Sequence, residues 1–179
     1  MEKSVLAGLK EIPSNSPEGH SFCGDIDMRI TRSGTWYYHG SPIRRKQLVK
    51  LFSSVLIRDE EGDFWLETPA EKCRIQVEDA PFVAVSMDVV GKGREQIVKF
   101  LTNVEEQVIA TPENPIWVDI NPESLEPSPY ILVRDGLHAL ISRAVFYELV
   151  ELGVEEESPE GKFLGVWSGG VFFKLGSVS

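Results

Sequence analysis

The sequence predicts a β-rich α+β fold of mainly antiparallel sheets, built from two similar strand-hairpin/helix/strand repeats, each with one packed helix. Three observations predict it. Short apolar runs alternating at period two recur between Gly, Pro and Asp turns, which is typical of strands and hairpins. Two stretches, SPIRRKQLVKLF and ALISRAVFYELV, carry a helical apolar stripe. These two stretches and their flanks also match each other, which indicates a duplicated unit.

Composition bounds the protein class. The chain has 179 residues and a net charge of -10, which fits one domain or two small ones and disfavours nucleic acid or anionic lipid as a partner. Apolar runs are too short for a membrane span, and the N-terminus lacks a signal-peptide pattern, so we expect a cytoplasmic protein. The two cysteines form no CxxC pair, so we expect free thiols, no zinc site and no cofactor.

The first half is expected to hold a short helix at 1–9, a proline-containing tether to residue 22, and a first repeat over 23–102. The helix of that repeat is expected to begin near Arg44–Arg45 and to bury Leu48, Val49, Leu51 and Phe52. Gly62 suits the turn of a hairpin between two strands. The expected strands cover 25–30, 35–40, 55–58, 64–67, 73–79, 82–90 and 96–102.

The second repeat is expected over 103–179. A hairpin turning on Asp135–Gly136 precedes a helix from Arg143 to Leu152, with Ser142 as its N-cap and Gly153 just past its end. An acidic loop, EEESPEG, then leads to a last strand pair turning on Gly169–Gly170. The expected strands cover 117–120, 130–134, 137–141, 162–168 and 171–176.

The internal repeat rests on matched positions around the two helices. Each helix is preceded by a strand that ends in a glycine turn and followed by an acidic turn that ends in Gly and then Phe. Such a pattern favours two copies of one supersecondary unit, each burying a helix on a sheet. The matched pairs are Ile43 and Ile141, Arg45 and Arg143, Leu48 and Phe146, Leu51 and Leu149, Phe52 and Val150, Gly62 and Gly161, and Phe64 and Phe163.

Several longer motifs carry a family resemblance. DIDMRI, WYYHGSPI, LVKLFSSVL, FWLETPAEKCRIQVEDAPFVAV, YILVRDG, FYELVELG and GVWSGGVFF together closely resemble the bacterial family called domain of unknown function 1285. The resemblance covers about Cys23 to Leu175. It implies a β-rich α+β protein of two similar repeats and a role in signalling, and it supplies no reaction.

Familiar catalytic motifs do not fit. GVWSGG differs from the G-x-S-x-G nucleophile elbow because Val166 stands two residues before Ser168, and the motif lies between two expected strands. A tight hairpin is the favoured interpretation. VVGKGREQ lacks the third glycine of a dinucleotide-binding loop, and there is no Walker A sequence. The sequence therefore leans away from an enzyme.

The candidate ligand-binding residues lie at the helix starts. Arg45 and Arg143 stand in the first helical turn, where a cation opposes the helix dipole. The favoured, structural interpretation is that they pair with a neighbouring carboxylate or cover an apolar edge with their methylene groups. The functional alternative is that they bind an anionic group, a role that Arg44 and Lys46 would strengthen. Tyr38 and His39 complete the candidate set, as an aromatic handle beside the basic patch. The favoured function is a non-catalytic module that binds a small anionic ligand or a protein segment.

An alternative function uses the neighbourhood of Asp25, Asp27 and His39. If strands 25–30 and 35–40 pair, these side chains and Cys23 would converge as a hydrolase or metal-dependent site. Alternate carboxylates on a strand are also typical of its solvated face. The sequence leaves the oligomeric state open.

Overall fold

The structure is a computed structural model that describes residues 21–179. The helix and tether expected before residue 21 lie outside the described residues. The chain forms two compact units, Met1–Pro81 and Phe82–Ser179. The boundary therefore differs from the expected one at 102/103: residues 82–102, assigned to the first repeat from sequence, form strands that pair within the second unit. Neither helix of the described residues is long and apolar enough to cross a membrane.

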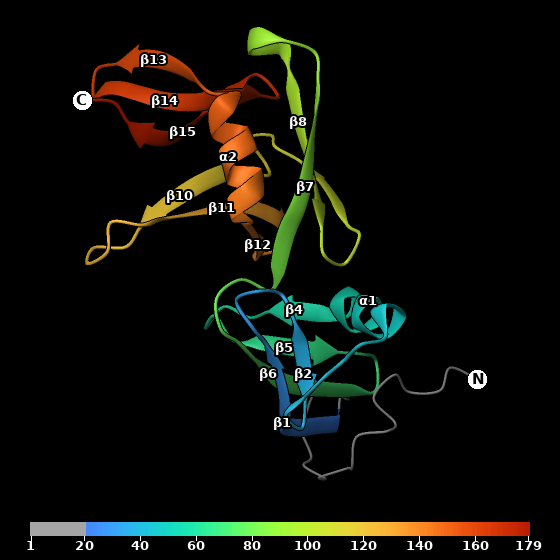
Figure 1. Cartoon of the computed structure of the whole chain (residues 1–179). Helices are drawn as coiled ribbons and strands as arrows, with labels where there is room; N and C mark the ends of the chain where they lie inside the picture. Colours follow the sequence, from blue (N-terminus) through green and yellow to red (C-terminus); the bar gives the residue numbers. More distant parts are fainter. Residues whose placement is uncertain (1–20) are drawn as a thin grey trace. The chain divides into compact units, whose positions relative to one another are not determined.

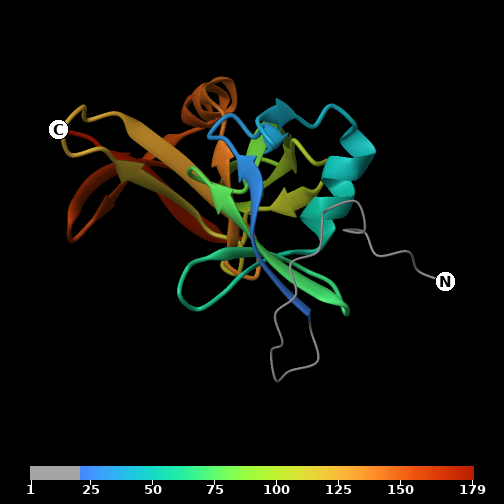
Figure 2. The same cartoon turned by 90° about the horizontal axis from the view of Figure 1, so that it is seen from below.

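The first unit is a six-stranded sheet in the order β3-β2-β1-β6-β5-β4 (Figures 1 and 2). Its chain forms a three-strand group, then helix α1, then a second three-strand group. All strand pairs are antiparallel except β1 with β6, the parallel seam that joins the two groups. The strands are β1 (Ser21–Ile30), β2 (Trp36–Tyr38), β3 (Ser41–Pro42), β4 (Leu56–Arg58), β5 (Phe64–Glu67) and β6 (Glu71–Val77).

Helix α1 (Lys46–Ser54) contributes Phe52 to the core of the first unit. The Phe52 ring stacks on Trp36 of β2, with the ring centroids 6.2 Å apart. Two sequence expectations need correction. The helix begins at Lys46, because Arg45 is an extended N-cap (φ -79°, ψ 103°). Leu51, expected to be buried, is 44% exposed, so the buried stripe is narrower than predicted.

The second unit contains another six-stranded sheet, in the order β10-β11-β12-β7-β8-β9 (Figure 1). Its pairs are antiparallel except β12 with β7. The turn at Asp135–Gly136 between β11 and β12 and the strand expected near 96–102 are both confirmed. The strands are β7 (Phe82–Val90), β8 (Ile97–Thr102), β9 (Gln107–Ile109), β10 (Ile116–Ile120), β11 (Pro127–Arg134) and β12 (Leu137–Ile141), and Gly93–Glu95 form a 3-10 turn.

Helix α2 (Arg143–Glu151) follows β12 and buries Val145 and Leu149. Its predicted N-cap is confirmed, because Ser142 Oγ accepts the Val145 N–H at 3.4 Å. A three-stranded sheet in the order β13-β14-β15 completes the unit. These strands are β13 (Val154–Ser158), β14 (Gly161–Ser168) and β15 (Val171–Ser177).

Strand β13 replaces much of the acidic loop expected at 155–161. Its three glutamates lie opposite β14, with Glu156 paired to Phe163 in the ladder. A strand at the edge of a sheet tolerates charged side chains, which also discourage pairing with other chains. The acidic composition that indicated a loop is therefore compatible with this edge strand.

The two similar repeats are confirmed as one succession of elements: a hairpin, a helix and a three-strand meander. The matched glycines both have positive φ: Gly62 in the turn between β4 and β5, and Gly161 at the first residue of β14, directly after the corresponding turn. The sheets divide differently. In the first unit the meander β4-β5-β6 joins the hairpin in one sheet, whereas in the second unit β13-β14-β15 form a sheet of their own.

The expectation of two free thiols is wrong. Cys23 of β1 and Cys73 of β6 form a disulfide, with their Cα atoms 5.1 Å apart across the parallel seam. The residues are 50 positions apart in sequence, so no local spacing pattern indicated the contact. Only the folding of β6 beside β1 brings the two sulfur atoms together.

Candidate functional site

The basic start of α1 comprises Arg44, Arg45 and Lys46, and all three side chains are exposed. Within residues 21–179, none of the three has a hydrogen-bond, ion-pair or ring partner. No side chain caps the helix, and its first turn contains no acidic residue. The cations therefore stand beside backbone N–H groups that also lack a side-chain acceptor.

Most other cations of the described chain have an aromatic or carboxylate partner. Arg58 and Lys72 lie over aromatic rings. Seven more have a carboxylate partner: Arg29, Arg32, Arg74, Arg94, Arg134, Lys162 and Lys174. The contrast singles out Arg44–Lys46 as a cationic surface, since carboxylates are abundant in this acidic chain.

Arg143 occupies the corresponding place in the second unit. It is the first residue of α2, directly after the Ser142 cap, and its side chain is exposed. Among the described residues it has no ion-pair partner. The structural interpretation of the duplicated arginines, pairing with a neighbouring carboxylate, therefore finds no such pair in residues 21–179.

Tyr38 and His39 lie at the end of β2, where the chain turns into β3. Their rings are 4.1 Å apart, and His39 adopts a left-handed backbone conformation with φ +48°. His39 Nδ1 lies 3.4 Å from Asp27 Oδ2, but the two side chains are 65% and 71% exposed. The predicted proximity of Asp27 and His39 is thus present on an open surface.

Asp25 is engaged elsewhere. Its carboxylate accepts two hydrogen bonds from Arg74 of β6, from Nε at 2.5 Å and from Nη2 at 3.0 Å. Arg74 Nη1 also donates to Asp63 Oδ2 at 3.2 Å. The cluster predicted for a hydrolase is therefore divided between an Asp27–His39 contact and an Asp25–Arg74–Asp63 network.

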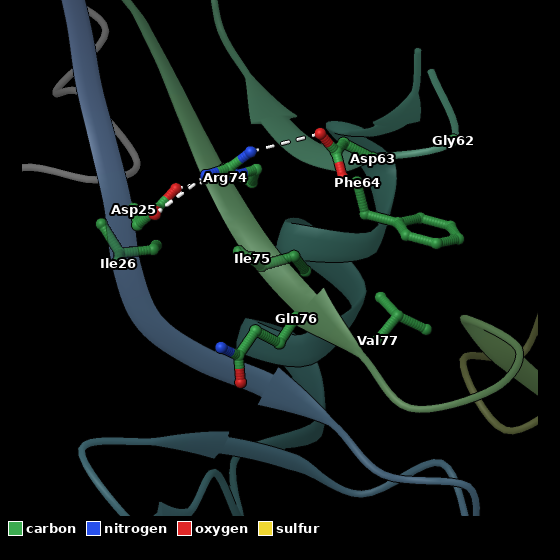
Figure 3. A pocket seen from close by; sticks show the side chains of 9 residues that line it. All are labelled: Asp25, Ile26, Gly62, Asp63, Phe64, Arg74, Ile75, Gln76 and Val77. Carbon is green, nitrogen blue, oxygen red and sulfur yellow. Dashed lines mark hydrogen bonds and ion pairs between the residues drawn. The ribbon is translucent and has the colours of Figure 1, made fainter. Parts of the chain in front are cut away.

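This network lines a cavity of about 390 Å³ on the first unit. Figure 3 shows the Arg74 side chain between the two carboxylates, with Gln76 further along β6. Two carboxylates against one guanidinium leave the cavity net acidic, so it differs in charge from the basic start of α1. Sequence analysis did not single out Arg74, because its carboxylate partners lie 49 and 11 residues away. The apolar remainder of the lining is Ile26, Phe64, Ile75 and Val77, with Gly62 at the turn.

The loop beside this cavity carries three clustered acids, Asp59, Glu61 and Asp63. Asp59 Oδ1 accepts the Asp63 N–H at 2.8 Å, and Asp59 Oδ2 accepts Trp65 Nε1–H at 2.8 Å. The bond from Trp65 lowers the pKa of Asp59, with smaller contributions from the loop N–H groups. Asp59 thus already accepts hydrogen bonds that order the hairpin turn, and the Asp63 carboxylate accepts one from Arg74.

Acidification should release the Asp25–Arg74 contact only at low pH. Hydrogen bonding to Arg74, assisted by its charge, lowers the pKa of Asp25 below the ordinary 3.8. A lowered folded-state pKa adds stability above the ordinary value, and this stability is lost as pH falls through the folded value. We expect the Asp25 carboxyl carbon to titrate by NMR below pH 3.8, and to return toward 3.8 in Arg74→Met. Titration at or above that value in the unaltered protein would contradict the contact.

Comparison with known families agrees with this organisation. Residues 17–80 match the "Domain of unknown function (DUF1285), N-terminal domain", and residues 81–175 match the "Protein of unknown function (DUF1285), C-terminal domain". The chain belongs to the DUF1285 family. The junction of the two family domains falls at the boundary between the two compact units.

Solved structures of DUF1285 proteins are similar to the chain. A DUF1285 family protein from Silicibacter pomeroyi DSS-3 is 46% identical, with a TM-score of 0.83, over 99% of this chain and 97% of that one. Another from Shewanella baltica OS155 is 24% identical, with a TM-score of 0.54, over 71% of this chain and 92% of that one, and it shows the fold alone. No curated protein matches the chain.

Proposed function

We propose that this DUF1285 protein is a non-catalytic binding module whose first unit docks an acidic segment of a partner protein on Arg44, Arg45 and Lys46. The observation that carries the proposal is the exposed, unpartnered state of these three cations within residues 21–179. In a chain of net charge -10, such a cluster offers a local attraction that opposes the mean field. We propose that this docking serves a regulatory or signalling role.

The shape of the surface favours a protein segment over a small ligand. Small-molecule sites are concave and enclose most of the ligand. Arg44–Lys46 line neither the cavity around Arg74 nor a second cavity of about 240 Å³ beside Trp167. Three consecutive exposed cations suit an extended acidic chain, which makes several contacts at once and complements the charges along its length. Leu51, exposed one turn further along α1, gives the partner an apolar contact.

The alternative enzyme function lacks a comparable observation. Asp27 and His39 are mostly exposed, and Asp25 is held by Arg74. A general acid or base needs a pKa matched to its task and a substrate position within hydrogen-bond reach. The three residues instead belong to two separate surface contacts, Asp27 with His39 and Asp25 with Arg74.

Charge reversal at the start of α1 tests the proposal. The double substitution Arg44→Glu/Lys46→Glu leaves the N-cap residue Arg45 in place. We expect it to weaken binding of a fluorescein-labelled polyglutamate peptide by at least roughly tenfold, because each lost contact removes a charge-assisted attraction. Fluorescence anisotropy at two salt concentrations measures the affinity and its screening.

A matched variant distinguishes binding at Arg44–Lys46 from a general effect of the protein's net charge. Lys92→Glu/Lys99→Glu changes the net charge equally, at two cations of the second unit without an ion-pair partner among the described residues. Equal loss of binding in both variants would reduce the effect to net charge and overturn the proposal. Arg143→Glu, tested alone, reports whether the start of α2 contributes. Binding of inorganic phosphate by the same residues, without the peptide, would point to a small anionic ligand instead.

A further inference from the structure

The disulfide lies at an interruption of the strand pair that joins the two halves of the first sheet. The parallel ladder between β1 and β6 is interrupted between Phe22 and Gly24, and again between Asp25 and Arg29. Cys23 occupies the first interruption. Since β1–β6 is the one junction between the two strand groups of this sheet, its regularity decides how firmly the groups are joined.

Two side-chain links join the strands beside the first interruption, where Gly24 pairs with Cys73 and Asp25 with Arg74 in the ladder. Cys23–Cys73 joins the strands covalently, and its Cα separation of 5.1 Å lies within the range of about 4.4–6.8 Å typical of disulfides. The adjacent residue of β6, Arg74, binds Asp25 of β1 through two hydrogen bonds. Cys73 is buried, whereas Arg74 reaches the outer side of the strand and lines the cavity of Figure 3. The covalent link therefore lies next to the cavity wall.

The two sulfur atoms differ in access. Cys73 is 1% exposed, whereas Cys23 is half-buried. Thiol–disulfide exchange needs an attacking thiolate to reach a sulfur atom, so the more accessible cysteine meets an external reagent first. We therefore expect Cys23 to react with the external reagent, and Cys73 to displace that reagent from Cys23 in the second step.

We propose that Cys23 and Cys73 form a reversible thiol–disulfide site, exchanging with a small disulfide of the glutathione type, that controls how firmly β1 is held at the cavity around Arg74. In the oxidising direction, the Cys23 thiolate attacks the small disulfide, forms a mixed disulfide and expels one small thiolate. The Cys73 thiolate then attacks the Cys23 sulfur and expels the second. Two electrons pass from the cysteine pair to the small disulfide, which leaves as two thiols carrying the two protons.

Reduction leaves the interrupted backbone ladder, with the Asp25–Arg74 contact as the side-chain link beside it. An exposed ion pair contributes little compared with a covalent cross-link. Local opening of β1 from β6 should therefore become more frequent, and the opening changes the wall to which Asp25 and Ile26 belong.

The test uses the full chain equilibrated in glutathione buffers of graded reduced-to-oxidised ratio. Acid quenching, alkylation and intact mass spectrometry count free thiols, and hydrogen exchange by mass spectrometry measures local opening in the same samples. We expect interconversion between forms with two and no free thiols. We also expect exchange roughly tenfold faster at 24–27 and 72–76 in the reduced form, with 82–179 unchanged.

Three results would overturn the proposal. The thiols could stay free in excess oxidised glutathione, or the disulfide could stay intact in excess reduced glutathione. The rate of hydrogen exchange at 24–27 and 72–76 could also be the same in the reduced and the oxidised form. Cys23→Ser/Cys73→Ser should reproduce the exchange of the reduced protein and lose its response to the buffers. If this variant fails to fold, the reduced unaltered protein still decides the outcome. Arg74→Met, which removes the ionic link, should add to the effect of reduction at 24–27.

Discussion

Replacing Gly165 with alanine is expected to lower the free energy of unfolding of the second unit by about 3 kcal/mol. Gly165 lies in β14 opposite Lys174 of β15. A Cβ atom there would lie 2.4 Å from the ring of Phe172 and 2.4 Å from the carbonyl oxygen of Phe173. The ring can rotate away, but the carbonyl belongs to the paired strand, so relief requires the two strands to move apart.

Gly176 provides a matched control for this prediction. It lies on β15 opposite Leu164, and a Cβ atom added to it would meet no atom within 4 Å. Gly176→Ala is therefore expected to be neutral or slightly stabilising. Urea unfolding of both variants, followed by hydrogen exchange in 82–179, measures the difference. Equal midpoints for the two variants would show that the strand pair accommodates the methyl group.

Ser168→Ala is expected to destabilise the second unit by a similar amount, about 3 kcal/mol. Ser168 is 0% exposed. Its Oγ accepts the N–H of Val98 at 2.9 Å and donates to the carbonyl of Ala110 at 2.7 Å. Alanine lacks the hydroxyl and so makes neither hydrogen bond. The buried Val98 N–H and the buried Ala110 C=O then lose this partner.

Ser177→Ala, on the exposed end of β15, is the control for Ser168→Ala. The same unfolding measurement applies. We also expect the Val98 amide to be protected from hydrogen exchange in the unaltered protein and to lose this protection only in Ser168→Ala. Unchanged stability would mean that a water molecule or a small backbone shift replaces both bonds. This role also accounts for the GVWSGG motif, because a serine that links β14 to Val98 and Ala110 is positioned for structure rather than for attack on a substrate.

Part of the candidate site follows from local sequence. Arg44, Arg45, Lys46 and Arg143 were singled out because charge at a helix start is a local pattern, and the structure places all four at the surface. Their binding role stays a prediction. Arg74 was missed, because the guanidinium has meaning only beside Asp25 and Asp63, which other strands supply. The sequence was also compatible with two roles for Arg45 and Arg143, pairing with a carboxylate of the protein or binding an anionic ligand. The lack of a carboxylate partner in residues 21–179 depends on distances that no spacing reveals.

The sequence by itself determined the features that arise from neighbours along the chain. Period-two alternation placed the strands, Asp135–Gly136 placed a hairpin, and Ser142 placed the start of α2, since each depends on local backbone conformation and hydrogen bonding. Tertiary structure decided the features that depend on contacts between distant segments. It joined Cys23 to Cys73, assigned residues 82–102 to the second unit, and made β13 a strand despite its three glutamates. Two strands pair when the fold brings their edges together. Which strands meet depends on how apolar side chains are buried across the whole unit, and not on the sequence of any single segment.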